Sequence, residues 1–168
     1  SISLLCFNKH CPTDVNPSSP LSTISSHLSF QPPLVVIILF LANDFPLPPS
    51  NKFFTVNIAE VAKQARVILI SLPKPEHVTS VVREGENCLL AGAITGSVII
   101  DTSTVDPTTS RQNAEAASKQ VVGYLDCPVL GRPNNCGNWP LPTGGKAQDI
   151  TIARPVLETF AAKIVHMG

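Results

Sequence analysis

Two continuous apolar runs constrain the fold of this chain most strongly. Arg66–Leu72 (RVILISL) and Ser97–Asp101 (SVIID) are rich in β-branched residues and do not alternate apolar with polar side chains. Strands that are covered by helices on both faces have this composition, and they are typical of parallel sheets. The runs therefore predict buried strands of an α/β domain.

Segments with helical patterns lie around these strands. Asp106 and Pro107 are an N-cap acid and an N1 proline, so they predict the start of a helix that ends near Gln120. A loop that carries three glycines is predicted before it. Strands alternating with helices predict βαβ units, and hence a parallel sheet with right-handed crossovers. The full prediction has helices at 59–65, 76–83, 106–120 and 148–161, strands at 66–72, 97–101, 121–126 and 163–167, and a loop with Gly85, Gly92 and Gly96.

The first fifty residues differ in composition from the rest of the chain. They hold three of the 24 charged side chains but eight of the 16 prolines, together with nine serines. A change of this kind indicates two segments, with a boundary near residues 50–55. We therefore expect 1–55 to be irregular or disordered, an unrelated edge or a mispredicted leader, and 56–168 to form the ordered α/β part.

Leu34–Ala42 (LVVIILFLA) is the most apolar stretch. Its nine residues are about half of the ~20 that a membrane-spanning helix needs. No basic segment precedes it and no convincing cleavage site follows, which argues against a signal peptide. It also fits a buried parallel strand, and a membrane anchor is the weakest reading.

The charged residues and cysteines exclude several classes of function. Lysine plus arginine equals aspartate plus glutamate, so no overall field favours nucleic acid or an anionic membrane, and neither is predicted as a partner. The five cysteines show no disulfide spacing, which indicates reduced thiols in an intracellular compartment. Cys6, His10 and Cys11 lack a second ligand pair, so no metal site is predicted.

Three predicted turns lie where ligands bind to parallel sheets. In open α/β sheets the binding crevice is outside the carboxyl ends of the strands. Here those ends are followed by 71–73 (SLP), 101–104 (DTST) and 126–129 (DCPV). The alternative is that these are ordinary turn residues, since Ser and Thr are common where a strand leads into a helix.

Four stretches in this order resemble a known family. They are AEVAKQARVILISLPKPEHV, GSVIIDTSTVDPTTSRQNAEAA, LDCPVLGRP and RPVLETFAAKIVHMG, which together lie within about 113 of the 168 residues. The chain is similar here to the NAD(P)-binding domain of 3-hydroxyisobutyrate and 6-phosphogluconate dehydrogenases, the β-hydroxyacid dehydrogenase family. The resemblance implies a partial Rossmann-like, doubly wound parallel sheet that lacks its first βα unit.

The resemblance also implies roles for individual residues. Leu72, Pro73 and His77 would approach NAD or NADP, and Thr104 would lie beside the nicotinamide. Ser103 would contact the carboxylate of a small hydroxy-acid substrate, since a hydroxyl donates without adding charge near the hydride path. Which of the two cofactors binds stays open.

The loop after the third strand departs from the family pattern. Relatives commonly read D-x-P-V-S-G-G, with the Ser and the glycines binding substrate, whereas this chain reads DCPVLGR. Of those three positions only Gly131 matches, and it is implied in substrate binding. Arg132 is either an anion-binding fork or, more simply, an exposed loop residue. Pro140 and Pro142 each remove a ladder donor, which makes a central strand at 139–143 improbable.

Two motifs of the family are not found in these 168 residues. No G-x-G-x-x-G occurs, although the cofactor pyrophosphate needs a glycine-rich turn at a helix N-terminus. The family's catalytic lysine follows the position of Gly168, as does the helical domain that forms dimers, so no catalytic residue is assigned. The expectation is a fragment related to NAD(P)-dependent oxidoreductases, inactive as it stands, with a cytoplasmic or, by family, mitochondrial location. The alternative is a non-enzymatic α/β domain that binds a partner through a sheet edge or the apolar N-terminal segment.

Overall fold

The computed structural model describes residues 2–3, 40–41, 57–131 and 137–168. The predictions for 1–55, for Cys6, His10, Cys11 and Leu34–Ala42, and for Arg132 fall wholly or almost wholly outside these ranges. Two short strands, β1 (Ile2–Ser3) and β2 (Phe40–Leu41), pair antiparallel. The remaining elements are α1 (Ile58–Ala62), β3 (Val67–Ile70), α2 (Pro75–Arg83), α3 (Leu89–Gly92), β4 (Val98–Asp101), α4 (Pro107–Lys119), β5 (Gly123–Asp126), β6 (Trp139–Thr143), α5 (Ala147–Leu157) and β7 (Ala161–His166).

A three-stranded parallel sheet forms the centre of the domain. Its order is β3–β4–β5, and the last residues of the three strands, Ile70, Asp101 and Asp126, stand side by side in the register. Every residue of β3 and β4 is buried, as the continuous apolar runs predict. The predicted α/β class and parallel sheet are confirmed.

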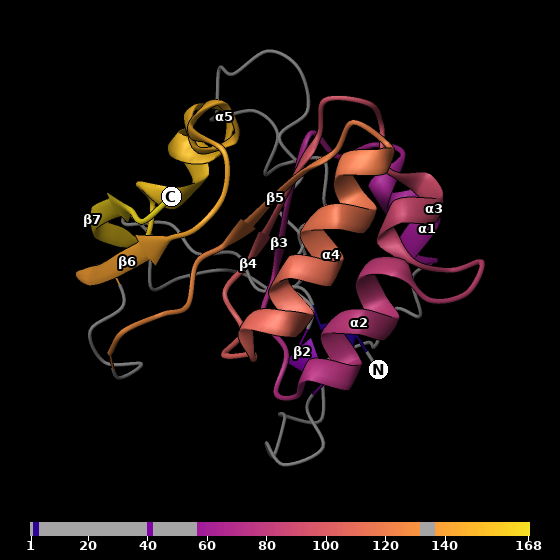
Figure 1. The fold of residues 1–168 in the computed structure, drawn as a ribbon, viewed down its shortest axis with the longest axis horizontal. Helices are drawn as coiled ribbons and strands as arrows, with labels where there is room; N and C mark the ends of the chain where they lie inside the picture. Colours follow the sequence, from indigo (N-terminus) through magenta and orange to yellow (C-terminus); the bar gives the residue numbers. More distant parts are fainter. Residues whose placement is uncertain (1, 4–39, 42–56, 132–136) are drawn as a thin grey trace, which may run out of the picture.

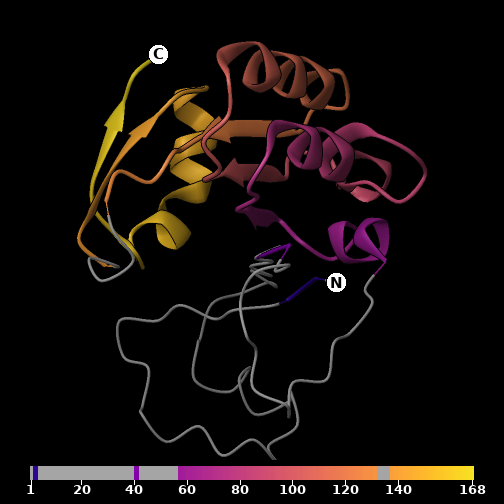
Figure 2. The same cartoon turned by 90° about the horizontal axis from the view of Figure 1, so that it is seen from below.

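Helices cover both faces of this sheet, so it is doubly wound. Figure 1 shows α2 and α4 lying over one face, and Figure 2 shows α5 on the opposite side. Alternate strand residues divide between the two faces, because successive side chains of a strand point in opposite directions. Ile68, Ile70 and Ile99 pack in a core with α1–α4, whereas Val98 and Ile100 pack in a second core with α5.

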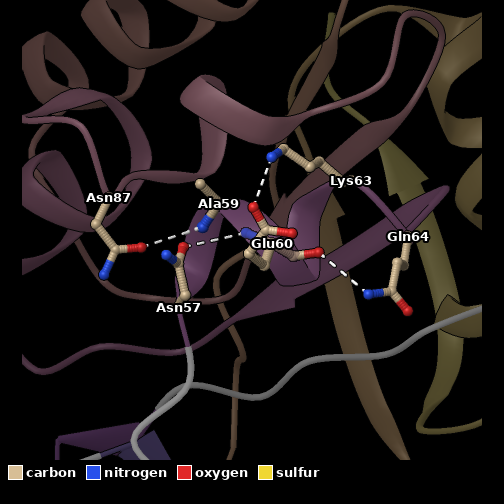
Figure 3. A network of polar contacts seen from close by, with 6 residues as sticks. All are labelled: Asn57, Ala59, Glu60, Lys63, Gln64 and Asn87. Carbon is tan, nitrogen blue, oxygen red and sulfur yellow. Dashed lines mark hydrogen bonds and ion pairs between the residues drawn. The ribbon is translucent and has the colours of Figure 1, made fainter.

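The short helix α1 is fixed by polar contacts at its N-terminus. Asn57 is the N-cap, and its Oδ1 accepts the backbone N–H of Glu60 at 3.1 Å (Figure 3). Asn87 approaches from the segment before α3, and its Oδ1 accepts the N–H of Ala59 at 3.2 Å. Lys63 then forms an ion pair with Glu60 at 2.6 Å on the exposed side. The two asparagine contacts satisfy N–H groups that the first helical turn leaves without intrahelical partners.

The predicted glycine-containing loop before β4 contains a helix. Leu89 and Leu90 are buried in the first turn of α3, which packs against α1 and α2. The close approach of α1 and α3 requires the glycine at position 92, because a Cβ there would overlap the backbone of Ala59. The loop prediction was wrong at this point: glycine usually disfavours a helix, but here it permits the packing that holds one.

A strand also forms at 139–143, where the sequence predicts none, but, as its two prolines lead one to expect, it is not part of the central three-stranded sheet. β6 pairs along its length with β7 in parallel, and it meets β5 only through an antiparallel bridge in which the Gly144 N–H donates to the Asp126 carbonyl at 2.8 Å. Because backbone groups alternate sides along a strand, Pro140 and Pro142 place their nitrogens on the same side as the Gly144 N–H. The missing donors therefore face away from the β6–β7 ladder, which explains why the strand tolerates two prolines.

Candidate functional site

The three turns singled out in the sequence lie at one edge of the sheet. Since Ile70, Asp101 and Asp126 are in register and the strands are parallel, the chain leaves all three at the same edge. Two backbone hydrogen bonds continue the pairing beyond the strands. The Thr102 N–H donates to the Ile70 carbonyl at 2.9 Å, and the Cys127 N–H donates to the Asp101 carbonyl at 2.7 Å.

Leu72 and Ser103, which the sequence places in two different turns, are in direct contact. The backbone N–H of Leu72 donates to Ser103 Oγ at 2.9 Å. Both residues are buried, with 5% of Leu72 and 3% of Ser103 exposed. The Ser103 hydroxyl therefore joins the turn after β4 to the turn after β3.

Asp101, the first residue of the DTST turn, is the polar centre of this edge, although no role of its own is predicted for it from the sequence. Its Oδ1 accepts the Ser103 N–H at 2.9 Å, and its Oδ2 accepts the Tyr124 hydroxyl at 2.6 Å. Burial raises the pKa of the Asp101 carboxyl, and the hydrogen bonds from Ser103 and Tyr124 offset only part of that rise. Burial and the nearby Asp101 charge raise the pKa of Tyr124, so its hydroxyl stays protonated and acts as a donor.

The remaining two hydroxyls of the DTST turn have opposite environments. Thr102 is buried, and its Oγ1 donates to the carbonyl of Ile70 at 2.9 Å. Thr104 is exposed, and the structure gives its side chain no hydrogen bond within the described part of the chain. Thr104 is thus the hydroxyl of this turn that faces outward.

Pro73 and His77 lie on the same side of the molecule, where β3 leads into α2. Pro73 is exposed, while His77 is half-buried in the first turn of α2. The Nδ1 atom of His77 is buried and has no hydrogen-bond partner among the described residues. Lys74, the N-cap residue, makes no side-chain capping bond, and its carbonyl accepts the N–H groups of His77 and Val78.

Gly131 is separate from the Leu72–Ser103 contact. It is exposed in the loop after β5, and the Trp139 ring approaches within 2.7 Å of where a Cβ would be. No hydrogen bond in the described chain connects it with Ser103. The structure therefore brings together Leu72, Pro73, Ser103 and Thr104, and does not join Gly131 to them.

Cys127 belongs to the core beneath this edge and not to its surface. Its thiol is fully buried, 3.5 Å from Thr143 Oγ1. The pKa of Cys127 is raised to about 12, mainly by burial and to a smaller extent by the carboxylates of Asp126 and Asp101. A thiol in this state is not a nucleophile at neutral pH.

Other kinds of site are not found in the described residues. They contain no group of three His, Cys, Asp or Glu side chains that could hold a metal ion, and no helix long and apolar enough to cross a membrane. A shallow hollow of about 410 Å³ lies between the last turns of α2 and α4, lined by Arg83, Cys88, Leu90 and Lys119 among others. Because these turns are at the amino edge of the sheet, the hollow is remote from the site above.

A doubly wound parallel sheet with polar turns at the carboxyl ends of its strands is the architecture of the nucleotide-binding α/β domains. The family model for the NAD binding domain of 6-phosphogluconate dehydrogenase matches residues 49–168. The chain belongs to this family, so the predicted family and its NAD(P) cofactor class are confirmed.

Similar proteins agree with this assignment. Over 112 residues the chain is 40% identical to the probable mitochondrial 3-hydroxyisobutyrate dehydrogenase of Dictyostelium discoideum, a match that covers 66% of this chain and 35% of the relative. The 3-hydroxyisobutyrate dehydrogenase of Pseudomonas aeruginosa is 38% identical over 106 residues, with 62% and 35% covered. The chain thus spans about a third of the length of these relatives, and the match is to an NAD(P)-binding domain of 3-hydroxyisobutyrate dehydrogenase-like oxidoreductases.

Solved structures show the same fold. The Mycobacterium tuberculosis 3-hydroxyisobutyrate dehydrogenase with L-serine superposes with a TM-score of 0.59 at 32% identity, covering 66% of this chain and 37% of that one. Psf3 in complex with NADP+ and 2-OPP superposes with a TM-score of 0.63 at 26% identity, covering 66% and 40%.

Proposed function

We propose that residues 57–168 form the nicotinamide side of an NAD(P) site in an oxidoreductase that acts on the CH–OH group of a small 3-hydroxy acid. In this proposal Leu72, Pro73, His77 and Thr104 face the cofactor. Ser103 and Gly131 face the substrate. The observation that carries the proposal is the alignment of the three strand ends, which gathers Leu72, Pro73, Ser103 and Thr104 at one edge.

The residues at this edge fit a nicotinamide. Thr104 presents an exposed hydroxyl, and the exposed ring of Pro73 adjoins buried Leu72, so a polar and an apolar surface occur in adjacent turns. His77 has a buried ring nitrogen without a described partner, which a polar group of a ligand would satisfy. When bound, the cofactor would supply hydride transfer, while these side chains bind and orient it.

The pyrophosphate of the cofactor lacks its usual binding motif in this sequence. Pyrophosphate binding uses the N–H groups of a glycine-rich turn at a helix N-terminus, and the sequence contains no G-x-G-x-x-G. We therefore propose that a polypeptide of these 168 residues binds NADH or NADPH weakly and turns over no substrate by itself. For the protein in the cell we propose a cytoplasmic or mitochondrial location, in keeping with the mitochondrial relative from Dictyostelium.

The test is a cofactor titration with two readouts. NADH fluorescence should show no enhancement at micromolar protein, whereas millimolar NADH should shift the amide NMR signals of Leu72 and Thr104. Thr104→Val, which keeps the shape of an exposed side chain but removes the hydroxyl, should weaken those shifts, and Thr95→Val at the opposite edge is the matched control. Nanomolar to low-micromolar binding would overturn the role assigned to the glycine turn. Shifts that avoid the Leu72 and Thr104 turns would overturn the proposed site.

A further inference from the structure

We propose that Tyr124 and Asp101 are positioning residues, which hold Ser103 and, through it, the Leu72 amide at the ligand edge. This inference rests on the proposed function only for its consequence, because the hydrogen bonds concerned lie within the chain itself. It assigns a role to two residues that lie behind the exposed turns and would touch neither cofactor nor substrate.

The contacts form one continuous series of hydrogen bonds that links β5, the end of β4 and the turn after β3. Tyr124 in β5 donates its hydroxyl to Asp101 Oδ2 at 2.6 Å, and Asp101, the last residue of β4, accepts the Ser103 N–H on Oδ1 at 2.9 Å. Ser103 in turn accepts the Leu72 N–H on Oγ at 2.9 Å. All four residues are buried, with none more than 5% exposed. A buried network whose members are all partnered is worth more than its separate bonds, and losing one member strains the others.

Each group in this chain has little freedom to adopt another geometry. An ionised carboxylate only accepts hydrogen bonds, so both Asp101 oxygens need donors, and Tyr124 supplies the one for Oδ2. The Tyr124 hydroxyl stays protonated because burial and the nearby Asp101 charge disfavour its ionised form. Removing the Tyr124 hydroxyl therefore leaves a buried carboxylate oxygen without its donor, which favours a shift of Asp101 relative to Ser103.

The Ser103 hydroxyl transmits this position to the neighbouring turn. The oxygen uses one acceptor site for Leu72, and the hydroxyl also lies close enough to the Asp101 carboxylate to lower its pKa in part. A shift of Asp101 would thus move Ser103 Oγ away from the Leu72 N–H. Leu72 directly precedes the exposed Pro73, and Thr104 directly follows Ser103. The positions of Pro73 and Thr104, two of the proposed cofactor contacts, therefore depend on the Leu72–Ser103 hydrogen bond.

The first test measures the Leu72–Ser103 hydrogen bond in the 168-residue chain without ligand. Amide hydrogen exchange by NMR should show Leu72 protected in the unmodified chain and about tenfold or more faster in Tyr124→Phe, as expected when a buried hydrogen bond weakens. The Val98 amide, bonded to the Arg66 carbonyl at the other end of the same strands, is the internal reference and should change little. Thr102→Val is the matched control, because it removes a different hydroxyl that joins β4 to β3. Unchanged Leu72 exchange in folded Tyr124→Phe, or an equal acceleration in Thr102→Val, would overturn the proposal.

A second measurement needs no variant, and it tests the contacts from Asp101 through Ser103 to Leu72 even if Tyr124→Phe does not fold. On acidification, the amide shifts of Ser103 and Leu72 should move with one common midpoint, because protonation of Asp101 changes the acceptor for Ser103 and, through it, the donor geometry at Leu72. Asp126, the neighbouring residue on β5 whose charge contributes to the raised pKa of Asp101, is followed through its own side-chain signal as a reference. If the amide shift of Leu72 did not change with pH in step with that of Ser103, the proposed link from Asp101 through Ser103 to Leu72 would be contradicted.

The last arm separates this inference from the proposed function. NADH-induced shifts at Thr104 should need several-fold more NADH in Tyr124→Phe than in the unmodified chain, while Thr102→Val should need about the same. If NADH shifts the amide signals of neither Leu72 nor Thr104 in the unmodified chain, the proposed function fails. The exchange data alone then test the positioning role of Tyr124. If the shifts occur and Tyr124→Phe leaves their concentration dependence unchanged, the positioning role fails and the proposed function stands.

Discussion

Gly92 in α3 lies directly against the carbonyl group of Ala59 in α1. A Cβ built on Gly92 would overlap the Ala59 carbonyl oxygen, and it would stand 2.6 Å from the carbonyl carbon. Both residues are buried, so neither backbone has room to withdraw. The contact fixes how α1, the only helix among the residues described before β3, joins the rest of the domain.

Gly92→Ala should therefore lower the free energy of unfolding. The expected loss is about 1–3 kcal/mol, the usual cost of adding atoms to a packed interior, and the contact with a rigid backbone places it toward the upper end. Urea unfolding followed by circular dichroism would measure it as a lower midpoint with an unchanged slope. Ala91→Ser, at the exposed neighbouring position of α3, is the control and should stay within about 0.5 kcal/mol. Equal stability of Gly92→Ala and Ala91→Ser would show that α1 does not pack on α3 in this way.

Val121 is a β-branched residue at a position whose backbone conformation favours glycine. Its φ is +58°, in the left-handed region that a β-branched residue rarely adopts, and 66% of it is exposed. The turn from α4 into β5 imposes this conformation through two hydrogen bonds. The Gly96 N–H donates to the Val121 carbonyl, and the Val122 N–H donates to the Ala117 carbonyl. The valine thus costs backbone strain of about 1–2 kcal/mol while burying little apolar surface.

We expect Val121→Gly to raise the free energy of unfolding by about 1 kcal/mol, which is the relieved strain less the entropy that glycine gains in the unfolded chain. Thermal or urea unfolding would measure the gain. Val121→Ala removes the β-branch but keeps a Cβ in the left-handed region, so it should gain less. An alanine variant as stable as the glycine variant would mean that strain at φ +58° is not the cause.

The sequence predicts the parallel strands of this domain well, because their signal is local. The runs that contain β3 and β4 are apolar throughout, and only a strand covered on both faces needs that pattern. The start of α4 is equally local, since Asp106 accepts the N–H groups of Thr108 and Thr109 as an N-cap residue should. The turns at the carboxyl edge follow from the same strands once their direction is known.

What the sequence does not predict depends on packing between distant segments. Tyr124 reaches Asp101 only because β5 lies beside β4 in one particular register, and no local pattern specifies that register. The helix at 89–92 depends on a glycine that fits against α1, although glycine by itself indicates a loop. The strand at 139–143 depends on which side its prolines face, which is decided by β7. In each case the outcome depends on a tertiary contact that no local pattern specifies.

Asp101→Asn should change how stability depends on pH. Burial raises the pKa of folded Asp101 above its ordinary value of 3.8, so over the interval above 3.8 the folded chain holds a proton that the unfolded chain has lost. The contribution of Asp101 to stability is thus complete below the unfolded pKa and is lost as pH rises through the folded pKa. Asparagine keeps an oxygen acceptor for Ser103 and has no charge to bury.

The measurement is urea unfolding of both proteins from acidic to neutral pH. The stability of Asp101→Asn relative to the unmodified chain should increase as pH rises from about 3.8, and then level off above the folded pKa of Asp101. Other acids, including Asp149, whose pKa burial also raises, are present in both proteins and cancel in the difference. A difference that is flat, or that falls with rising pH, would contradict a buried Asp101 with a raised pKa.

Cys127 should resist alkylation while the domain is folded. Its thiol is fully buried against Thr143, and its pKa of about 12 leaves almost no thiolate in mildly alkaline buffer. Treatment with iodoacetamide followed by peptide mass mapping should therefore leave Cys127 unmodified in the native chain and label it fully in concentrated urea. Adding Gly92→Ala should speed the labelling in proportion to its loss of stability, because opening of the fold precedes reaction. Labelling of native Cys127 at the rate seen in urea would mean that the core beneath the carboxyl edge is open to solvent.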